Sequence, residues 1–278
     1  MATRRKFLAT AGIFTAGLVA GQFRASAAHV QDIGIQLYTV RAGMLADARG
    51  TLAQLAGLGY REIESASSVK GHYYGLSAKE IKQMTHDLGL TLRSSHVQLD
   101  EHWQRTIDEA AEAGQQYLIC STMPSTGQTA SNYERVADVF NKSAEACRKA
   151  GLLFGYHNHE YEFGQENGQT FYDILLTKTD PQLVHMELDL GWVVAAGQDP
   201  LRYFERYPGR FPLWHLKDMK RDQAVSTELG TGRVPLAQLL KNAPQAGLKH
   251  FFVEQEAYEK SALDSARRDI AYLRQLAY

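Results

Sequence analysis

Cysteine is scarce in this chain, with only 2 among 278 residues. Cys120 and Cys147 are too few for a disulfide framework or a thiolate metal cluster, so we expect two buried or half-buried free thiols. No charge of one sign is in excess either, because 30 Lys+Arg residues face 31 Asp+Glu residues. With 44 % hydrophobic and 22 % charged residues, the composition excludes a disordered or fibrous protein and indicates a globular one.

The sequence also lacks a convincing membrane-spanning run, which needs about 20 apolar residues. The apolar run at 7–21 is shorter and weakly hydrophobic; it follows Arg4-Arg5-Lys6 and precedes Ala25-Ser26-Ala27, an A-x-A pattern typical of signal cleavage. The string TRRKFL resembles a twin-arginine export signal, and a basic start to a cytosolic protein is the less favoured interpretation. We therefore predict a signal peptide at 1–27, a mature domain at 28–278, a bacterial periplasmic location and no stable membrane anchor.

Nucleic acid is disfavoured as a partner by the charge of the predicted mature chain. Residues 1–27 hold four basic residues and no acidic one, so the remainder carries 26 Lys+Arg against 31 Asp+Glu and a net charge of −5. Nucleic-acid binding requires a basic surface that neutralises phosphates. We therefore expect a small-molecule substrate, and the sequence leaves homo-oligomer formation open.

Short apolar runs alternate with longer helical patterns along the rest of the chain. Each run has five to seven residues rich in β-branched, aromatic or leucine side chains, as is usual for strands. The predicted strands are 33–39, 60–64, 91–97, 117–121, 152–157, 183–189, 211–216 and 250–254. The predicted helices are 45–58, 77–88, 103–113, 133–150, 170–177, 200–207, 235–246 and 261–276.

Glycines recur where a predicted helix gives way to the next strand, at Gly59, Gly89, Gly114, Gly151 and Gly247. Glycine just past a helix end adopts the left-handed conformation that other residues resist. A repeated strand–helix–glycine order predicts parallel strands with right-handed crossovers. Eight such units in about 250 residues favour one α/β domain, a closed (β/α)8 TIM barrel.

Ionisable residues gather at the ends of the predicted strands, where such barrels place their active sites. Asp189, His215 and Glu254 end three consecutive strands, and His157 and His159 follow the fifth. Carboxylates with one or two imidazoles suit one divalent metal ion, with Mn²⁺ preferred and Mg²⁺, Co²⁺ or Zn²⁺ as alternatives. Three other carboxylates have a plainer interpretation as solvated loop residues; they are Glu160, Glu187 and Glu256.

At these residues the chain resembles the xylose-isomerase-like TIM barrels, often called sugar phosphate isomerases/epimerases. The resemblance covers 32–278, and its motifs occur in order, one per strand or loop. They are the strings GIQLYTVR (34–41), SHV (95–97), YHNHEYEF (156–163), ELDLGW (187–192), HLKD (215–218), ELGTG (228–232) and VEQ (253–255).

The resemblance implies a metal site of Glu, Asp, His and Glu from strands five to eight. Its last three members correspond to Asp189, His215 and Glu254. The resemblance leaves the first ligand open, because the chain has His157 where many relatives have glutamate. Glu162 is our first choice for this ligand, with Glu160 second, and His157 or His159 as imidazole alternatives.

The implied chemistry is proton abstraction next to the carbonyl of a keto-sugar, through a metal-stabilised enediolate. The candidate bases are Glu162, Glu254, His157 and His159, and Lys217 is expected to steady the oxyanion unless it merely pairs with Asp218. Further residues near the strand ends are expected to contact substrate; they are Gln36, Tyr38, Glu64, His96 and Trp192. Trp192 stands where the related endonucleases carry another histidine, which further disfavours a role in DNA repair.

Three functions remain open at this stage. A metal-dependent sugar isomerase or epimerase is the first. Phosphorylated sugars are cytosolic metabolites, so the close alternative for an exported enzyme is a periplasmic 3-keto-glycoside lyase that eliminates the aglycone by the same chemistry. A non-catalytic exported sugar-binding barrel is the least favoured, because the chain keeps Asp189, His215 and Glu254.

The export prediction can be checked directly. Because the A-x-A pattern ends at Ala27, we expect the exported protein to begin at Ala28. N-terminal sequencing of the secreted material measures this. Secreted protein that still begins at Met1 contradicts the signal-peptide assignment.

Overall fold

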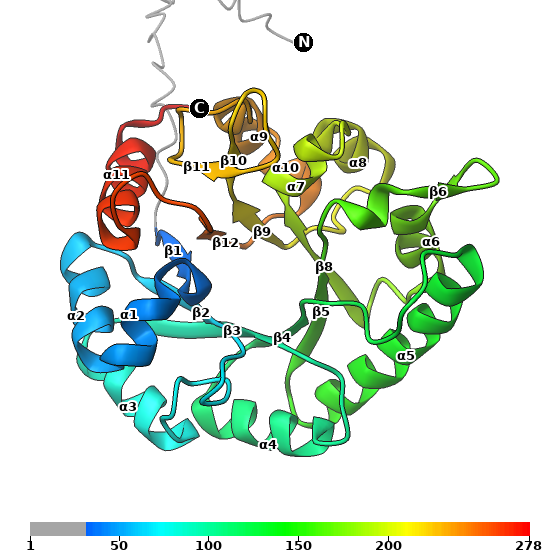
Figure 1. The fold of residues 1–278 in the computed structure, drawn as a ribbon. Helices are drawn as coiled ribbons and strands as arrows, with labels where there is room; N and C mark the ends of the chain where they lie inside the picture. The colour runs from blue at the N-terminus through cyan, green and yellow to red at the C-terminus, as the bar shows by residue number, and fades with distance from the viewer. Residues whose placement is uncertain (1–31) are drawn as a thin grey trace, which may run out of the picture.

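Eight parallel strands close into a barrel in the computed structural model, which describes residues 32–278 (Figure 1). Their order around the barrel is β1-β12-β9-β8-β5-β4-β3-β2, so neighbours in sequence are neighbours in space once the short added strands are set aside. The predicted (β/α)8 barrel is confirmed. The barrel strands are β1 Gly34–Gln36, β2 Glu62–Ser65, β3 Thr91–Val97, β4 Tyr117–Cys120, β5 Leu153–His157, β8 Val184–Asp189, β9 Leu213–Leu216 and β12 His250–Val253.

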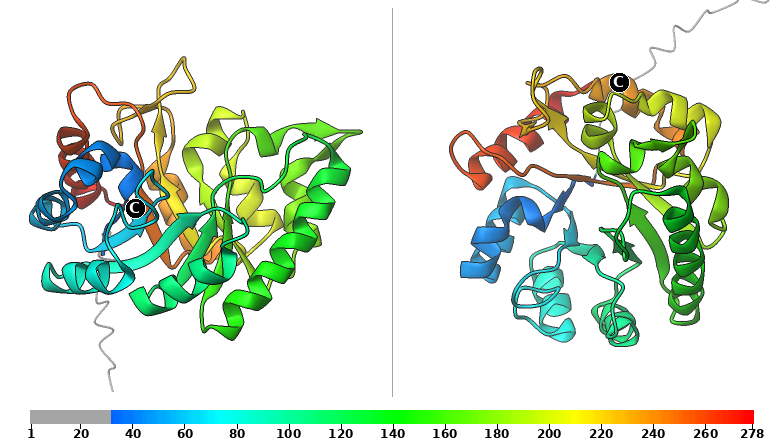
Figure 2. Two further views of the ribbon diagram at one scale, coloured as in Figure 1. Left: turned by 60° about the horizontal axis from the view of Figure 1, so that its bottom comes forward. Right: turned by 45° about the vertical axis from the view of Figure 1, so that its right-hand side comes forward.

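Helices surround the barrel on its outside, as Figures 1 and 2 show. Two antiparallel pairs of very short strands lie outside the barrel sheet: β6 Gln165–Glu166 with β7 Gln169–Thr170, and β10 Asp218–Met219 with β11 Ser226–Thr227. The helices are α1 Arg41–Ala46, α2 Ala48–Leu58, α3 Ala78–Asp87, α4 Trp103–Ala113, α5 Ala130–Lys149, α6 Phe171–Lys178, α7 Leu190–Ala195, α8 Pro200–Arg206, α9 Leu236–Lys241, α10 Ala243–Ala246 and α11 Ala262–Gln275.

Among the differences from the prediction, one strand end and one additional helix arise because side chains cap new helical turns. Strand one ends at Gln36 rather than at residue 39, since the Gln36 side chain accepts a hydrogen bond from the backbone N–H of Tyr38 at 2.9 Å and starts a 3-10 helix, Leu37–Val40. Helix α7 was not predicted. It starts directly after β8, where the side chain of Asp189 accepts from the N–H of Trp192 at 2.9 Å.

The interior of the barrel is filled below the strand ends. Side chains alternate between the two faces of a strand, so every second residue points into the barrel. Four of these form a separate apolar cluster, Tyr117, Ile119, Leu213 and Phe252. Beneath them, near the strand starts, Glu62 pairs with Arg93 at 2.6 Å and with His250 at 2.9 Å. The inside of the barrel is therefore packed, and barrels of this kind build their active sites at the C-terminal ends of the strands.

Three further predictions concern the cysteines, membrane-spanning helices and the signal peptide. Cys120 and Cys147 are both buried and free, as expected. Within residues 32–278, no helix combines the length and apolar character that crossing a bilayer requires. The predicted signal peptide lies outside the described residues.

Gly247 ends α10 with φ of +82°, and a Cβ placed there would lie 2.7 Å from the backbone of Gly209. We expect Gly247→Ala to destabilise the fold by about 1–3 kcal/mol, because the added methyl group meets both an unfavourable dihedral and backbone atoms. Urea unfolding measures the change.

Gly57→Ala is the matched control. Gly57 lies within α2, and a Cβ there meets nothing within 4 Å. We expect it to stabilise the protein by about 0.5–1 kcal/mol, since alanine is the better helix former. Equal effects of the two substitutions would show that the conformation at Gly247 is not constrained.

Candidate metal and active site

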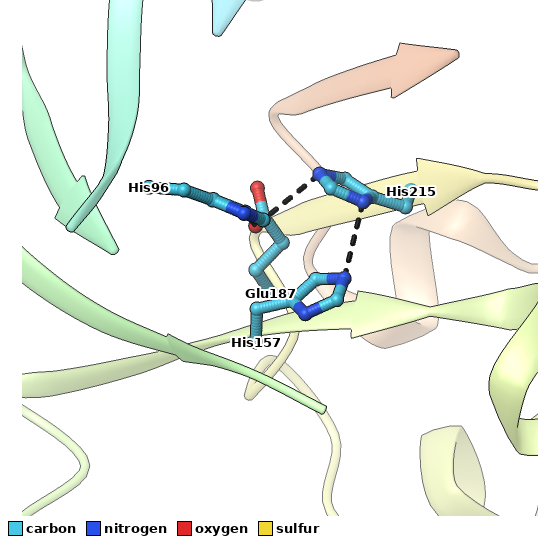
Figure 3. Close-up of side chains that lie close together, drawn as sticks. All are labelled: His96, His157, Glu187 and His215. Atoms are coloured by element: carbon cyan, nitrogen blue, oxygen red, sulfur yellow. Dashed lines mark hydrogen bonds and ion pairs between the residues drawn. The ribbon is translucent and has the colours of Figure 1, made fainter. Parts of the chain in front are cut away.

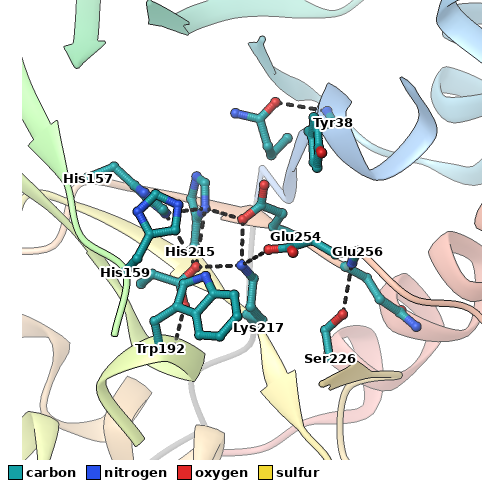
Figure 4. Close-up of polar contacts among 12 residues, drawn as sticks. Tyr38, His157, His159, Trp192, His215, Lys217, Ser226, Glu254 and Glu256 are labelled. Atoms are coloured by element: carbon teal, nitrogen blue, oxygen red, sulfur yellow. Dashed lines mark hydrogen bonds and ion pairs between the residues drawn. The ribbon is translucent and has the colours of Figure 1, made fainter. Parts of the chain in front are cut away.

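The strand ends place pairs of ionisable side chains one pleat apart. Because residues i and i+2 share a face, Glu187 and Asp189 of β8 both point into the barrel. His215 and Lys217 at the end of β9 do the same, and all four side chains are fully buried. The recurring pattern of polar, apolar, polar residues in the sequence therefore produces one converging set, of which Figure 4 labels His215 and Lys217.

Four donor atoms meet at this end of the barrel, from His157, Asp189, His215 and Glu254. His157 Nε2 lies 3.1 Å from His215 Nδ1 and 3.3 Å from Asp189 Oδ2, and His215 Nδ1 lies 2.9 Å from Glu254 Oε2. All four ligand atoms lie within 4.8 Å of one another and all four residues are buried. Two imidazole nitrogens and two carboxylate oxygens fit a borderline divalent cation such as Mn²⁺, Co²⁺ or Zn²⁺.

The orientation of the His215 ring is set by Glu64 on β2. His215 Nε2 lies 2.7 Å from Glu64 Oε1, and the carboxylate of Glu64 also accepts from Gln36 Nε2 at 2.9 Å and Ser94 Oγ at 2.6 Å. Although burial opposes it, the neighbouring imidazoles of His96 and His215 hold the pKa of Glu64 well below its ordinary value. An ionised Glu64 accepts the Nε2 proton, so that Nδ1, once it has lost its own proton, would be the nitrogen that binds a metal; proteins usually orient a metal-binding histidine in this way.

Glu187 and His96 form a second buried pair next to this one (Figure 3). His96 Nε2 lies 2.7 Å from Glu187 Oε2 and 3.2 Å from Glu64 Oε1. Glu187 has no exposed surface, so its interpretation as a solvated loop residue is wrong. Burial raises the pKa of Glu187 to about 7, whereas the two carboxylates outweigh burial and raise the pKa of His96 to about 9.

Two imidazoles of the site, those of His157 and His159, are kept neutral, whereas the carboxylates of Glu187 and Glu254 outweigh burial and raise the pKa of His215 well above its ordinary value. Burial lowers the pKa of His157 well below its ordinary value, and burial together with the charge of Lys217 lowers the pKa of His159 to about 4. The rings of His96 and His157 lie 4.8 Å apart. A protonated imidazole thus lies beside unprotonated ones at neutral pH, and groups whose pKa values are moved apart in this way can serve as acid and base.

Lys217 does not pair with Asp218. Its Nζ lies 2.9 Å from both Asp189 Oδ2 and Glu254 Oε2 and 2.6 Å from Glu256 Oε1. The indole ring of Trp192 covers this ammonium group at 4.8 Å. Gly191 makes room for the lysine, because a Cβ at Gly191 would lie 2.7 Å from Lys217 Cγ. The buried ammonium group of Lys217 therefore neutralises part of the negative charge of the three carboxylates around it.

Glu162, our first choice for the missing ligand, is not brought into the donor group. It lies in a 3-10 turn, Tyr161–Phe163, where its carboxylate accepts hydrogen bonds from the Tyr156 hydroxyl and from the backbone N–H of His159. Burial raises its pKa to about 7. Glu160 is exposed. His157, and not Glu162, therefore lies with Asp189, His215 and Glu254 in the group that could hold a metal, and Glu162 supports the backbone at His159.

Asp218 has a structural task that the sequence did not reveal. Its Oδ2 accepts from the N–H groups of Gly230 at 2.9 Å and Gly232 at 2.8 Å, and its Oδ1 accepts from Val234 at 3.0 Å. These N–H groups are the ones that a phosphate would need in this loop. The glycine turn is therefore closed by an aspartate and offers no phosphate cradle.

A cavity of about 290 Å³ opens above the donor atoms. Of the residues expected to contact substrate, Tyr38 and His96 line it, whereas Gln36 and Glu64 are fully buried and bonded to each other. Trp192 lies to the side, over Lys217. The full lining is Tyr38, Ala66, Ser67, His96, Gln98, Ser121, Thr122, His157, His159, Glu254 and Glu256.

Residues 52–276 match the family model described as xylose isomerase-like TIM barrel. The chain belongs to this family. A sugar phosphate isomerase/epimerase from Parabacteroides distasonis has a similar structure, with 28 % identity and a TM-score of 0.79 over 90 % of this chain and 96 % of that one. A xylose isomerase-like protein from Mycobacterium smegmatis, solved in complex with magnesium, shares the fold at 17 % identity and a TM-score of 0.68, over 90 % and 98 % of the two chains.

Similarity to curated proteins is confined to part of the chain. An inosose dehydratase from Lacticaseibacillus casei is 34 % identical over 96 residues, which are 34 % of this chain and 32 % of that enzyme. The chain thus spans about a third of the length of the curated relatives it matches. This partial match assigns no reaction to the chain.

The identity of the fourth ligand is testable by metal binding. We expect His157→Ala to weaken Mn²⁺ binding at least tenfold, because it removes one of four donors. Glu162→Gln should change Mn²⁺ affinity less than threefold. Glu162 is not one of the four residues whose atoms could bind the metal, and glutamine keeps an acceptor for the His159 N–H. Calorimetric titration of the metal-free variants measures both. The reverse order of effects would return the ligand position to Glu162.

Proposed function

We propose that the protein removes a proton next to the carbonyl of a neutral keto-sugar, using a divalent cation held by His157, Asp189, His215 and Glu254. The observation that carries this proposal is the meeting of these four buried donors at the floor of a ligand-sized cavity. A cation there would polarise the substrate carbonyl and make the neighbouring C–H bond more acidic.

His159 is the residue best suited to take the proton. Of the four candidate bases, Glu162 is bonded elsewhere, while His157 and Glu254 point toward the donor group. His159 lines the cavity, is unprotonated at neutral pH, and has no partner for its Nδ1 among the described residues. An imidazole in this position can accept a proton when a substrate carbon lies within reach.

His96 is the matching proton donor. It lines the same cavity, and its contacts with Glu64 and Glu187 keep its ring protonated. Lys217 adds a fixed positive charge beside Asp189 and Glu254, close to where negative charge on the substrate oxygen would develop. One side chain thus accepts a proton, a second returns one, and a third stabilises the charge between the two events.

The cavity favours an uncharged sugar over a sugar phosphate. No lysine or arginine occurs among its lining residues, whereas Glu254 and Glu256 do. The loop that could have bound a phosphate is closed by Asp218. This electrostatic argument agrees with the predicted export of the protein, since phosphorylated sugars are cytosolic.

We infer that the reaction continues as an elimination, and that the substrate is a 3-keto-glycoside. The C2–H bond breaks, its electron pair forms a C1–C2 double bond, and the C1–O bond to the aglycone breaks while that oxygen gains a proton. The likeness to inosose dehydratase, whose name describes an elimination of water, supports this outcome. Isomerisation or epimerisation is the second candidate, supported by the likeness to the Parabacteroides distasonis protein.

Proton NMR in D₂O with Mn²⁺-loaded protein distinguishes these outcomes. With a 3-keto-glucoside we expect release of the aglycone. Deuterium exchange beside the carbonyl would accompany it where proton abstraction is reversible. Exchange or a new epimer from free ketoses, without cleavage, would instead identify an isomerase or epimerase. Glu254→Gln should lose both metal and turnover, because it removes a donor. The absence of exchange and cleavage with every sugar would leave a binding protein.

A further inference from the structure

Tyr38 exposes an aromatic ring at the edge of the cavity. Only three large hydrophobic side chains are exposed among the described residues, and Tyr38, at 40 %, is the one that lines this cavity. The other two, Val69 and Val139, do not line it. In Figure 4 the ring stands on the far side of Glu254 from His157 and His159. The cavity therefore runs from the catalytic imidazoles to an aromatic rim.

The ring is held in place from behind. The guanidinium of Arg41 covers it at 4.3 Å and donates to the backbone carbonyl of Tyr38 at 2.9 Å and to the Tyr258 hydroxyl at 2.7 Å. Tyr258 in turn donates to the carbonyl of Thr39 at 2.6 Å. With Arg41 on one face, a second ring can stack only on the other. A side chain fixed in this way loses little conformational freedom when a ligand binds.

The two ends of the cavity differ in chemistry. Carboxylates and imidazoles surround the inner end, as the hydroxyl groups of a sugar require, whereas the outer end is lined by the exposed phenol ring of Tyr38. A ring that stacks on tyrosine removes apolar surface from water, and the electrostatics of the aromatic face add to this gain. A substrate that fills both ends carries a sugar at the inner end and a second ring at the outer end.

We propose that Tyr38 forms a separate binding subsite for the leaving group of a glycoside, and that this leaving group carries a ring with an apolar face. The proposal rests on the proposed function, from which it takes the position of the sugar. It narrows the substrate class from keto-sugars in general to glycosides with a ring-bearing aglycone. The residue acts on affinity and leaves the proton transfers unchanged.

Binding of unreactive glycosides isolates this subsite from catalysis. Glucosides that are not oxidised at C3 lack the carbonyl and cannot react, so Kd is measurable by calorimetry with the Mn²⁺-loaded protein. We expect Tyr38→Ala to weaken phenyl β-glucoside binding about tenfold while methyl β-glucoside binding changes less than twofold. Tyr38→Phe should retain the affinity, and Val69→Ala, at an exposed residue outside the cavity, should change neither value.

Each other outcome contradicts the proposal. Equal losses with both glucosides would place the sugar itself on Tyr38, and equal affinity of the wild-type protein for both, or binding of neither, would show that no ring subsite exists. Cellobiose in place of phenyl glucoside tells whether a sugar ring or an aromatic ring is preferred. If the D₂O experiment shows neither exchange nor cleavage while Tyr38→Ala still weakens phenyl β-glucoside binding selectively, the catalytic proposal is refuted and the ring-binding subsite is retained.

Discussion

The hydrogen bond between His215 and Glu64 is the interaction on which the site depends. It crosses the barrel from β9 to β2, at 2.7 Å, and it decides which nitrogen of His215 faces the other donors. Glu64 can do this only while Gln36 and Ser94 hold it, so β1 and β3 take part although neither supplies a ligand. The orientation of the His215 ring thus depends on closure of the barrel, which brings β2 within reach of β9.

Charge is the second constraint on this arrangement. Glu64, Glu187, Asp189 and Glu254 are all buried within one small volume. Isolated buried carboxylates are very costly, so each must be paired, protonated or bound to a cation. The structure uses Lys217 for Asp189 and Glu254, the imidazolium groups of His96 and His215 for Glu64 and Glu254, and a raised pKa for Glu187. A divalent cation would take over the positive charge of His215, because His215 must lose its Nδ1 proton to bind it.

Most of the fold could be predicted from sequence because its signals are local. Strand composition and helix-ending glycines both act within a few residues, and the structure contains both. The site was predictable where side chains simply alternate, as at Asp189, His215 and Glu254. The site was not predictable at Glu162, because this residue lies in a 3-10 helix that directs its carboxylate toward Tyr156 and not toward Asp189, His215 and Glu254. Nor could local patterns reveal Glu187 beside His96, because that contact joins residues 91 positions apart.

The filled interior of the barrel has a kinetic consequence. Tyr117, Ile119, Leu213 and Phe252 fill the barrel beneath the strand ends, so a ligand enters the cavity from the strand-end side, and the part that enters deepest leaves last. For a glycoside split at this site, the aglycone lies nearer the opening and departs first, while the unsaturated sugar waits behind it. Product inhibition would then follow an ordered pattern, in which the sugar product competes with the substrate for the free enzyme and the aglycone does not.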